Sequence, residues 1–141
     1  MKNEQIKKLE WENENEFNYR KETGEIIFRT GNILKAIGEI ATKKGDLYSI
    51  KEKINKEYNK MRNLIIPNRY HIVHDFLLNC LKSYKRASNI LDAGIKENNS
   101  ALIYKAGRYI NEGNSWMEIA KIKIWESIED AVYENNKDKG V

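Results

Sequence analysis

The sequence predicts an all-α protein, an antiparallel up-down four-helix bundle built from long helices. Only 8 of its 141 residues are Gly and only 1 is Pro, so it lacks the frequent turn signals that a strand-rich fold needs. Apolar residues recur at spacings of three and four along four segments, which is the period of an amphipathic helix. Because the breaks between these segments are short, consecutive helices are expected to run in opposite directions.

The first predicted helix covers residues 3–44. Its first half is mostly polar and has few apolar anchors, so we expect a frayed or separately docked arm there. Its second half is strongly amphipathic. The apolar positions of that half are Ile26, Ile27, Ile33, Leu34, Ile37, Ile40 and Ala41. Gly45 suits the left-handed end of this helix, and Asp46 is a suitable N-cap for the next one.

Three further helices are predicted, over residues 47–65, 67–96 and 100–134. Pro67 separates the first two of them, because proline disfavours helix at the preceding residue and fits the first turn of a new helix. The third begins after the polar break Lys96-Glu97-Asn98-Asn99, where Ser100 is suited to cap it.

The last predicted helix contains a glycine that could interrupt it. Ser115 and Glu118 fit a capping box and would start a fifth helix just after Gly113. The apolar stripe nevertheless keeps its phase across Gly113, which favours one continuous helix with a weak point. Residues 1–134 are therefore predicted to form a single domain, and the polar tail 135–141 is expected to be disordered.

Neither the composition nor the first residues indicate a secreted or membrane protein. No stretch approaches the roughly 18 apolar residues of a membrane span, and no apolar run follows the first lysines. Cys80 is the single cysteine, so an internal disulfide is excluded. We expect a cytoplasmic protein that needs no cofactor.

Recognisable catalytic motifs are missing from the sequence. It contains no Gly-rich phosphate loop, no Gly-x-Ser-x-Gly and no Cys-x-x-Cys, so we expect a protein that is not an enzyme. His71, His74 and Asp75 form a weak candidate zinc site within one helical turn. The sequence places no fourth ligand near them. His74 also borders the apolar seam of its helix, where a buried and hydrogen-bonded histidine is the commoner outcome.

Gly24, Gly31, Gly38 and Gly45 recur one heptad apart along the first predicted helix. A glycine inside a helix costs up to about 1 kcal/mol relative to alanine, so three interior glycines need a reason. One interpretation is close packing of this helix against a neighbour within the bundle. The other is that Gly24, Gly31 and Gly38 form a face that docks a partner or a second copy.

The three tryptophans are interpreted as core or interface anchors. They are Trp11, Trp116 and Trp125. An exposed tryptophan is a strong candidate for partner binding, because its large apolar surface is often central to interfaces. Trp11 and Trp116 are therefore included as candidate partner-binding residues.

A family resemblance covers about residues 64–125. Ile66-Pro67 is followed by Tyr70 and His74 at the start of one helix, and the next helix holds Ala106, Tyr109-Ile110 and Glu112-Gly113-Asn114. This pattern resembles small helical proteins of unknown function from low-GC Gram-positive bacteria. The resemblance implies a helical fold and carries no activity, ligand or site residue.

Positive charge is concentrated in the middle of the chain. The net charge is +4, and residues 43–86 carry 11 basic and 4 acidic side chains. The second and third predicted helices should be adjacent, so their basic side chains are candidates for tracking a phosphate backbone. These candidates are Lys53, Lys56, Lys60, Arg62, Lys82, Lys85 and Arg86. The simpler interpretation is an ordinary solvated helix face, and the sequence shows no base-reading motif.

The function that the sequence favours is a non-enzymatic interaction protein that binds a protein partner through a helical surface. A fold without catalytic groups must act by binding, as small inhibitors, immunity proteins and accessory factors of mobile elements do. The second hypothesis is nucleic-acid binding by the basic middle segment. The third is a metal-dependent enzyme centred on His71, His74 and Asp75. Self-association of the chain is a further alternative.

Overall fold

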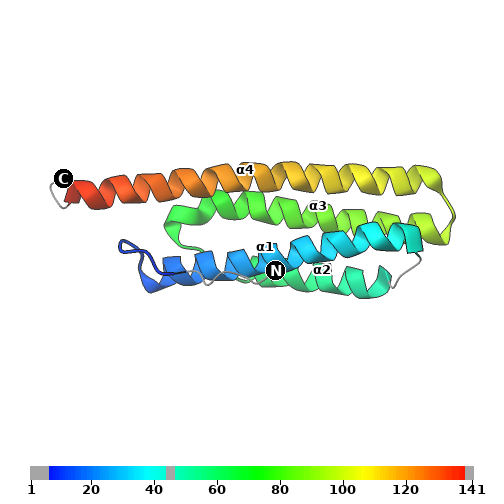
Figure 1. The fold of residues 1–141 in the computed structure, drawn as a ribbon, viewed down its shortest axis with the longest axis horizontal. Coiled ribbons are helices and arrows are strands. Elements are labelled where there is room, and N and C mark those ends of the chain that lie inside the picture. Colours follow the sequence, from blue (N-terminus) through cyan, green and yellow to red (C-terminus); the bar gives the residue numbers. More distant parts are fainter. Residues whose placement is uncertain (1–6, 44–46, 139–141) are drawn as a thin grey trace.

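The computed structural model describes residues 7–43 and 47–138, and side-chain surroundings within 7–37 and 47–137. Four α-helices fill most of this part of the chain, and none of the described residues lies in a β-strand. The prediction of an all-α four-helix bundle is confirmed. Figure 1 shows the helices running alternately in opposite directions, with α4 along one edge of the molecule. The helices are α1 (Glu14–Lys43), α2 (Leu47–Arg62), α3 (His71–Lys96) and α4 (Ser100–Asp138).

Helix α1 starts at Glu14, well after the predicted start at residue 3. The cause is a capping box: Asn13 Oδ1 accepts the backbone N–H of Glu16 at 2.8 Å, and Glu16 Oε1 accepts that of Asn13 at 3.1 Å. Just before it, Glu12 Oε1 accepts the N–H of Leu9 at 2.7 Å and stabilises a turn. The polar arm predicted at this end is therefore a turn followed by a capped helix start. The Gly45-Asp46 junction lies outside the described residues.

The connection between α2 and α3 is longer than a single proline break. Helix α2 ends at Arg62, and Pro67 is extended with φ −63° and ψ 148°. A short 3-10 turn, η1 (Asn68–Tyr70), follows before α3 begins at His71. Proline at position 67 thus sets the direction in which the chain enters η1.

The connection between α3 and α4 is a tight turn that involves Gly94, Asn98 and Asn99. Asn98 has a positive φ of 50°, and the N–H of Asn99 donates to the carbonyl of Gly94 at 2.8 Å. The side chain of Asn99 accepts the N–H groups of Ala101 and Leu102 at 3.1 and 3.3 Å. Asn99 therefore caps α4, in place of the predicted Ser100.

Helix α4 is continuous through Gly113, as the phase of its apolar stripe predicted. It also extends to Asp138, so residues 135–138 of the predicted disordered tail are helical. Residues 139–141 lie outside the described part of the chain. The red C-terminal end of α4 reaches past the start of α3 in Figure 1.

The core runs along the axis of the bundle, and every described helix contributes to it. Its largest fully buried side chains include three tyrosines, Tyr19, Tyr70 and Tyr84. Helix α4 contributes small buried residues, which allow it to lie close to α3. These are Ala106, Gly113, Ala120 and Ala131.

Candidate functional surfaces

Helix α4 exposes large apolar side chains on the side that faces away from the core. Ile122 is 57% exposed and Tyr133 is 70% exposed, while Ala120 and Ala131 are buried. Each exposed residue comes two positions after a buried one, which places it about 200° further around the helix. The apolar side chains are therefore opposite to the face that packs on α3.

Four of these residues lie along the second half of the helix and define what we call the α4 patch: Ile119, Ile122, Trp125 and Tyr133. Trp125 is 64% exposed, which makes it the most accessible of the three tryptophans, a residue type that is enriched at the centre of protein interfaces. Seven of the eleven exposed large apolar residues of the described chain lie on α4. The full α4 set is Ile103, Tyr104, Ile119, Ile122, Trp125, Val132 and Tyr133.

The predicted partner-binding tryptophans are less accessible than Trp125. Trp116 is half-buried and packs against Phe76 with ring centroids 5.6 Å apart. Trp11 is also half-buried, with the guanidinium of Arg69 at 5.3 Å from its ring. Sequence reasoning interpreted Trp125 as an anchor and missed its exposure. The sequence signal for this exposure is that Trp125 comes three residues after Ile122 and so shares its side of the helix, away from the side that carries the buried alanines.

Gly31 of α1 does not pack against a neighbouring helix. Gly31 is exposed, and a Cβ built there meets no atom within 4 Å. The prediction of close intramolecular packing is therefore wrong at Gly31. Gly24 is half-buried, and the surroundings of Gly38 lie outside the described residues. Of the predicted glycine docking face, the structure therefore describes two residues: Gly31, which is exposed, and Gly24, which is half-buried.

Four of the seven basic residues of the nucleic-acid hypothesis lie in two places, and the other three, Lys53, Lys82 and Arg86, are exposed. Tyr58 lies between Lys85, whose Nζ is 5.0 Å from the ring centroid, and Arg62, whose guanidinium carbon is 5.9 Å away. Both contacts are of the cation–π type. Lys56 and Lys60 instead line a shallow groove of about 790 Å³ between α1 and α2.

That groove is polar and of mixed charge. Its α1 side carries Glu22, Glu25 and Arg29, which face the lysines of α2. Arg29 binds the buried carboxylate of Glu57 at 2.9 Å, and Glu57 is only 4% exposed. The hydrogen bond to Glu57 raises the pKa of Arg29. The groove therefore places acidic side chains of α1 beside Lys56 and Lys60 of α2.

A second polar network surrounds Arg69, which lies in η1. Its Nε donates to Glu16 at 2.9 Å, and its Nη2 lies 3.5 Å from Glu134. One guanidinium thereby connects α1, η1 and α4. Nearby, Arg20 forms a two-pronged pair with the buried Glu12 at 2.8 Å. The Arg69 contacts connect the helices, and the Arg20–Glu12 pair holds the turn that precedes α1 against that helix.

The candidate zinc residues are not brought together. His74 is buried, and its Nδ1 lies 3.0 Å from the hydroxyl of Tyr19, while His71 and Asp75 are exposed. Burial lowers the pKa of His74 and raises that of Tyr19, so a neutral phenol and a neutral imidazole share this hydrogen bond. The part of the chain that is described holds no group of three or more His, Cys, Asp or Glu residues placed to bind a metal.

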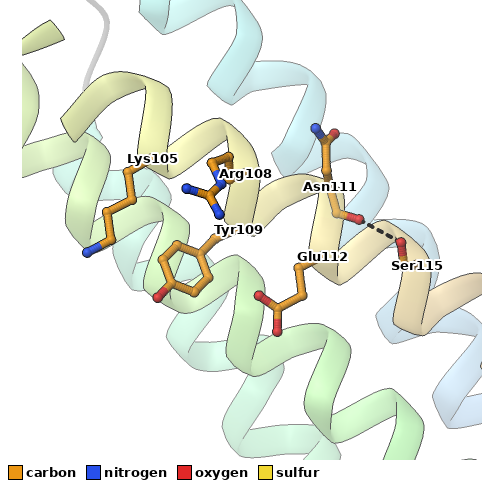
Figure 2. A pocket seen from close by; sticks show the side chains of 6 residues that line it. All are labelled: Lys105, Arg108, Tyr109, Asn111, Glu112 and Ser115. Atoms are coloured by element: carbon orange, nitrogen blue, oxygen red, sulfur yellow. Dashed lines mark hydrogen bonds between the residues drawn. The ribbon is translucent and has the colours of Figure 1, made fainter. Parts of the chain in front are cut away.

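Two further features carry no chemistry of their own. Burial raises the pKa of the Cys80 thiol to about 11, so it is a neutral core group and a poor nucleophile. A shallow pocket of about 430 Å³ lies on the N-terminal half of α4 (Figure 2). Its described lining consists of exposed polar side chains and the half-buried Tyr109, and within it Ser115 donates to the carbonyl of Asn111 at 3.1 Å.

Comparison of the chain with known protein families, with curated proteins and with solved structures gives no match. Within the described residues, no helix is both long enough and apolar enough to cross a membrane.

Proposed function

We propose that this protein is a non-enzymatic binding module that recognises a protein partner through the α4 patch. The observation that carries the proposal is the position of Ile119, Ile122, Trp125 and Tyr133 on the outer side of α4. Single exposed apolar residues are ordinary, whereas a group that includes Trp and Tyr on one face is typical of an interaction site.

The packing of α4 supports the same proposal. The helix is held along α3 by buried small residues, among them Ala106 and Ala120, and it is anchored near its C-terminal end by the Arg69–Glu134 pair. A face that is already fixed loses little conformational entropy when it binds. In this proposal the bundle is a scaffold that presents one straight helix, in the manner of a small inhibitor, immunity protein or accessory factor.

Nucleic-acid binding is a second candidate, and one observation favours it. The seven basic residues of the hypothesis form no ion pair within the described residues, and two of them flank Tyr58. Unpaired cations beside an aromatic ring suit a single strand of nucleic acid. Lys56 and Lys60, however, face the carboxylates of the α1–α2 groove, which weakens a continuous phosphate track.

Site-specific photocrosslinking tests the main proposal. A photoreactive amino acid replaces Trp125 in the native host, and a matched variant carries it at Tyr48, which is 68% exposed on α2. A partner of the α4 patch should crosslink from position 125 and not from position 48, and the purified partner should bind the wild type directly. Crosslinks from both positions, or from neither, would overturn the proposal.

A salt titration tests the second candidate function, nucleic-acid binding. Binding to DNA or RNA should weaken steeply with salt, because the cations displace counterions from the phosphates. The double variant Lys56→Glu with Lys85→Glu should abolish such binding. Affinity that survives this change would remove the nucleic-acid hypothesis, and salt-dependent affinity that disappears with it would displace the protein-partner proposal.

A further inference from the structure

The α4 patch is bordered by negative charge. Residues 118–134 carry 5 acidic and 2 basic side chains. The two lysines are already engaged: Lys121 binds Glu118 at 3.3 Å, and Lys123 binds Glu126 at 3.3 Å. The surroundings of the patch are therefore acidic although the whole protein has a net charge of +4.

Two carboxylates beside the patch form no ion pair within the described residues, Glu129 and Asp130. Both are exposed. Glu129 comes four residues after Trp125 and four before Tyr133, so these three side chains follow one line along α4. An apolar residue, a free carboxylate and a second apolar residue thus alternate on the surface.

From these observations we infer that the partner presents a basic amphipathic helix to the α4 patch. This inference rests on the proposed function and names the chemistry of its partner. The patch extends over about four turns, on the order of 21 Å from Ile119 to Tyr133, which is the contact length of a helix of about 15 residues lying alongside α4. Apolar residues of that helix cover Ile122 and Trp125, and its Lys or Arg residues meet the free carboxylates.

A second copy of the chain fits the same surface less well. Residues 118–134 carry 5 acidic and 2 basic side chains, so an antiparallel two-fold pair of α4 would bring two surfaces of the same negative sign together. Like charges placed opposite one another disfavour such a pair, so charge complementarity favours a basic partner over self-pairing of α4.

Two designed peptides provide the test. One is an amphipathic helix of about 18 residues made of Leu and Lys, and the other has Glu at every Lys position. The full-length protein should bind the Leu/Lys peptide in isothermal titration calorimetry and should not measurably bind the Leu/Glu peptide. The double variant Ile122→Ser with Trp125→Ser should lose this binding, and circular dichroism should show an unchanged fold.

Charge-reversal variants isolate the electrostatic part of the inference. Glu129→Lys with Asp130→Lys should weaken binding of the Leu/Lys peptide by on the order of tenfold, since two attractions become repulsions. The matched control, Glu52→Lys with Glu97→Lys, changes the net charge equally on exposed sites of α2 and the end of α3, and should change affinity by less than about twofold.

The outcomes distinguish this inference from the proposed function. Equal affinity for both peptides, equal loss in both charge-reversal variants, or no peptide binding would overturn the basic-helix inference. A dimer in analytical ultracentrifugation that Trp125→Ser dissociates would also overturn it, because the occupant would then be a second copy. The crosslinking from position 125 would still decide, independently, whether the patch binds a partner.

Discussion

The ring of Tyr84 on α3 occupies the space that a side chain at Gly113 of α4 would need. A Cβ at Gly113 would lie 2.5 Å from Cε1 of Tyr84, well inside van der Waals contact. The Tyr84 hydroxyl donates to Oδ1 of Asn114 at 2.5 Å, so the ring is held against the backbone of α4. The glycine that looked like a weak point of the helix is therefore the position where α4 leaves room for the ring of Tyr84.

Replacing Gly113 should therefore destabilise the bundle. Gly113→Ala gains helix propensity of up to about 1 kcal/mol, but the methyl group must displace a fully buried tyrosine, a type of overpacking that costs about 1–3 kcal/mol. We expect a net loss of about 1–2 kcal/mol in the free energy of unfolding. Urea denaturation followed by circular dichroism measures it.

Gly31→Ala is the matched control, because a Cβ at Gly31 meets open space on the same kind of helical backbone. Here only the propensity gain remains, so the free energy of unfolding should rise by about 0.5–1 kcal/mol. If both alanine variants gained stability, the close approach of Tyr84 and Gly113 would be refuted.

The Arg29–Glu57 pair gives a second prediction. Arg29→Met leaves the buried Glu57 carboxylate without its partner, whereas Arg29 itself is partly exposed and water can reach the groove. We expect a loss of about 1–2 kcal/mol in the free energy of unfolding, less than for a fully buried pair. Chemical denaturation measures this loss.

Two variants serve as controls for the Arg29–Glu57 pair. Lys123→Met, in an exposed pair on α4, should cost less than about 0.5 kcal/mol. The double variant Arg29→Met with Glu57→Met should recover most of the loss, since no buried charge remains. A double variant no more stable than Arg29→Met would argue against an unpaired carboxylate as the cause.

The histidine buried beside Tyr19 predicts how stability depends on pH. Burial, the largest cause, lowers the pKa of His74 in the folded protein below its ordinary value of 6.5. Below that value the unfolded chain binds a proton that the folded protein resists, so the free energy of unfolding should fall as the pH decreases from 6.5 toward the lowered pKa. Thermal unfolding between about pH 7 and pH 5 measures the slope.

His74→Gln should flatten that slope, because its amide does not titrate and can still accept a hydrogen bond from Tyr19. His71→Gln is the matched control on an exposed site at the start of α3, and it should keep the wild-type slope. A wild-type slope in the His74→Gln variant would show that carboxylates alone cause the acid destabilisation.

The helices could be predicted because their apolar residues follow a helical period, and because Pro67 marks the break after α2. The late start of α1 was missed although its signal is local: Asn13 and Glu16 form a capping box in the sequence itself. The α4 patch is a different case. Ala120 and Ala131 on one side, and Ile122 and Tyr133 on the other, both follow the helical period. Only the packing of α3 on the small residues decides which side is buried.

The last prediction separates function from stability at two tryptophans of α4. Trp116 packs against Phe76, so Trp116→Ala removes part of a core contact and should cost about 1–3 kcal/mol in the free energy of unfolding. Trp125 is 64% exposed, and Trp125→Ser should change that free energy by less than about 0.5 kcal/mol. Chemical denaturation of both variants measures the difference.

Partner binding should show the opposite order. A crosslinked partner, or the Leu/Lys peptide, should bind the Trp116→Ala variant at a temperature where it remains folded, because that side chain is not part of the α4 patch. The Trp125→Ser variant, although fully folded, should lose at least about tenfold in affinity, as expected when the central aromatic residue of an interface is removed. If Trp125→Ser instead unfolded the protein, Trp125 would belong to the core and the α4 patch would lose its central residue.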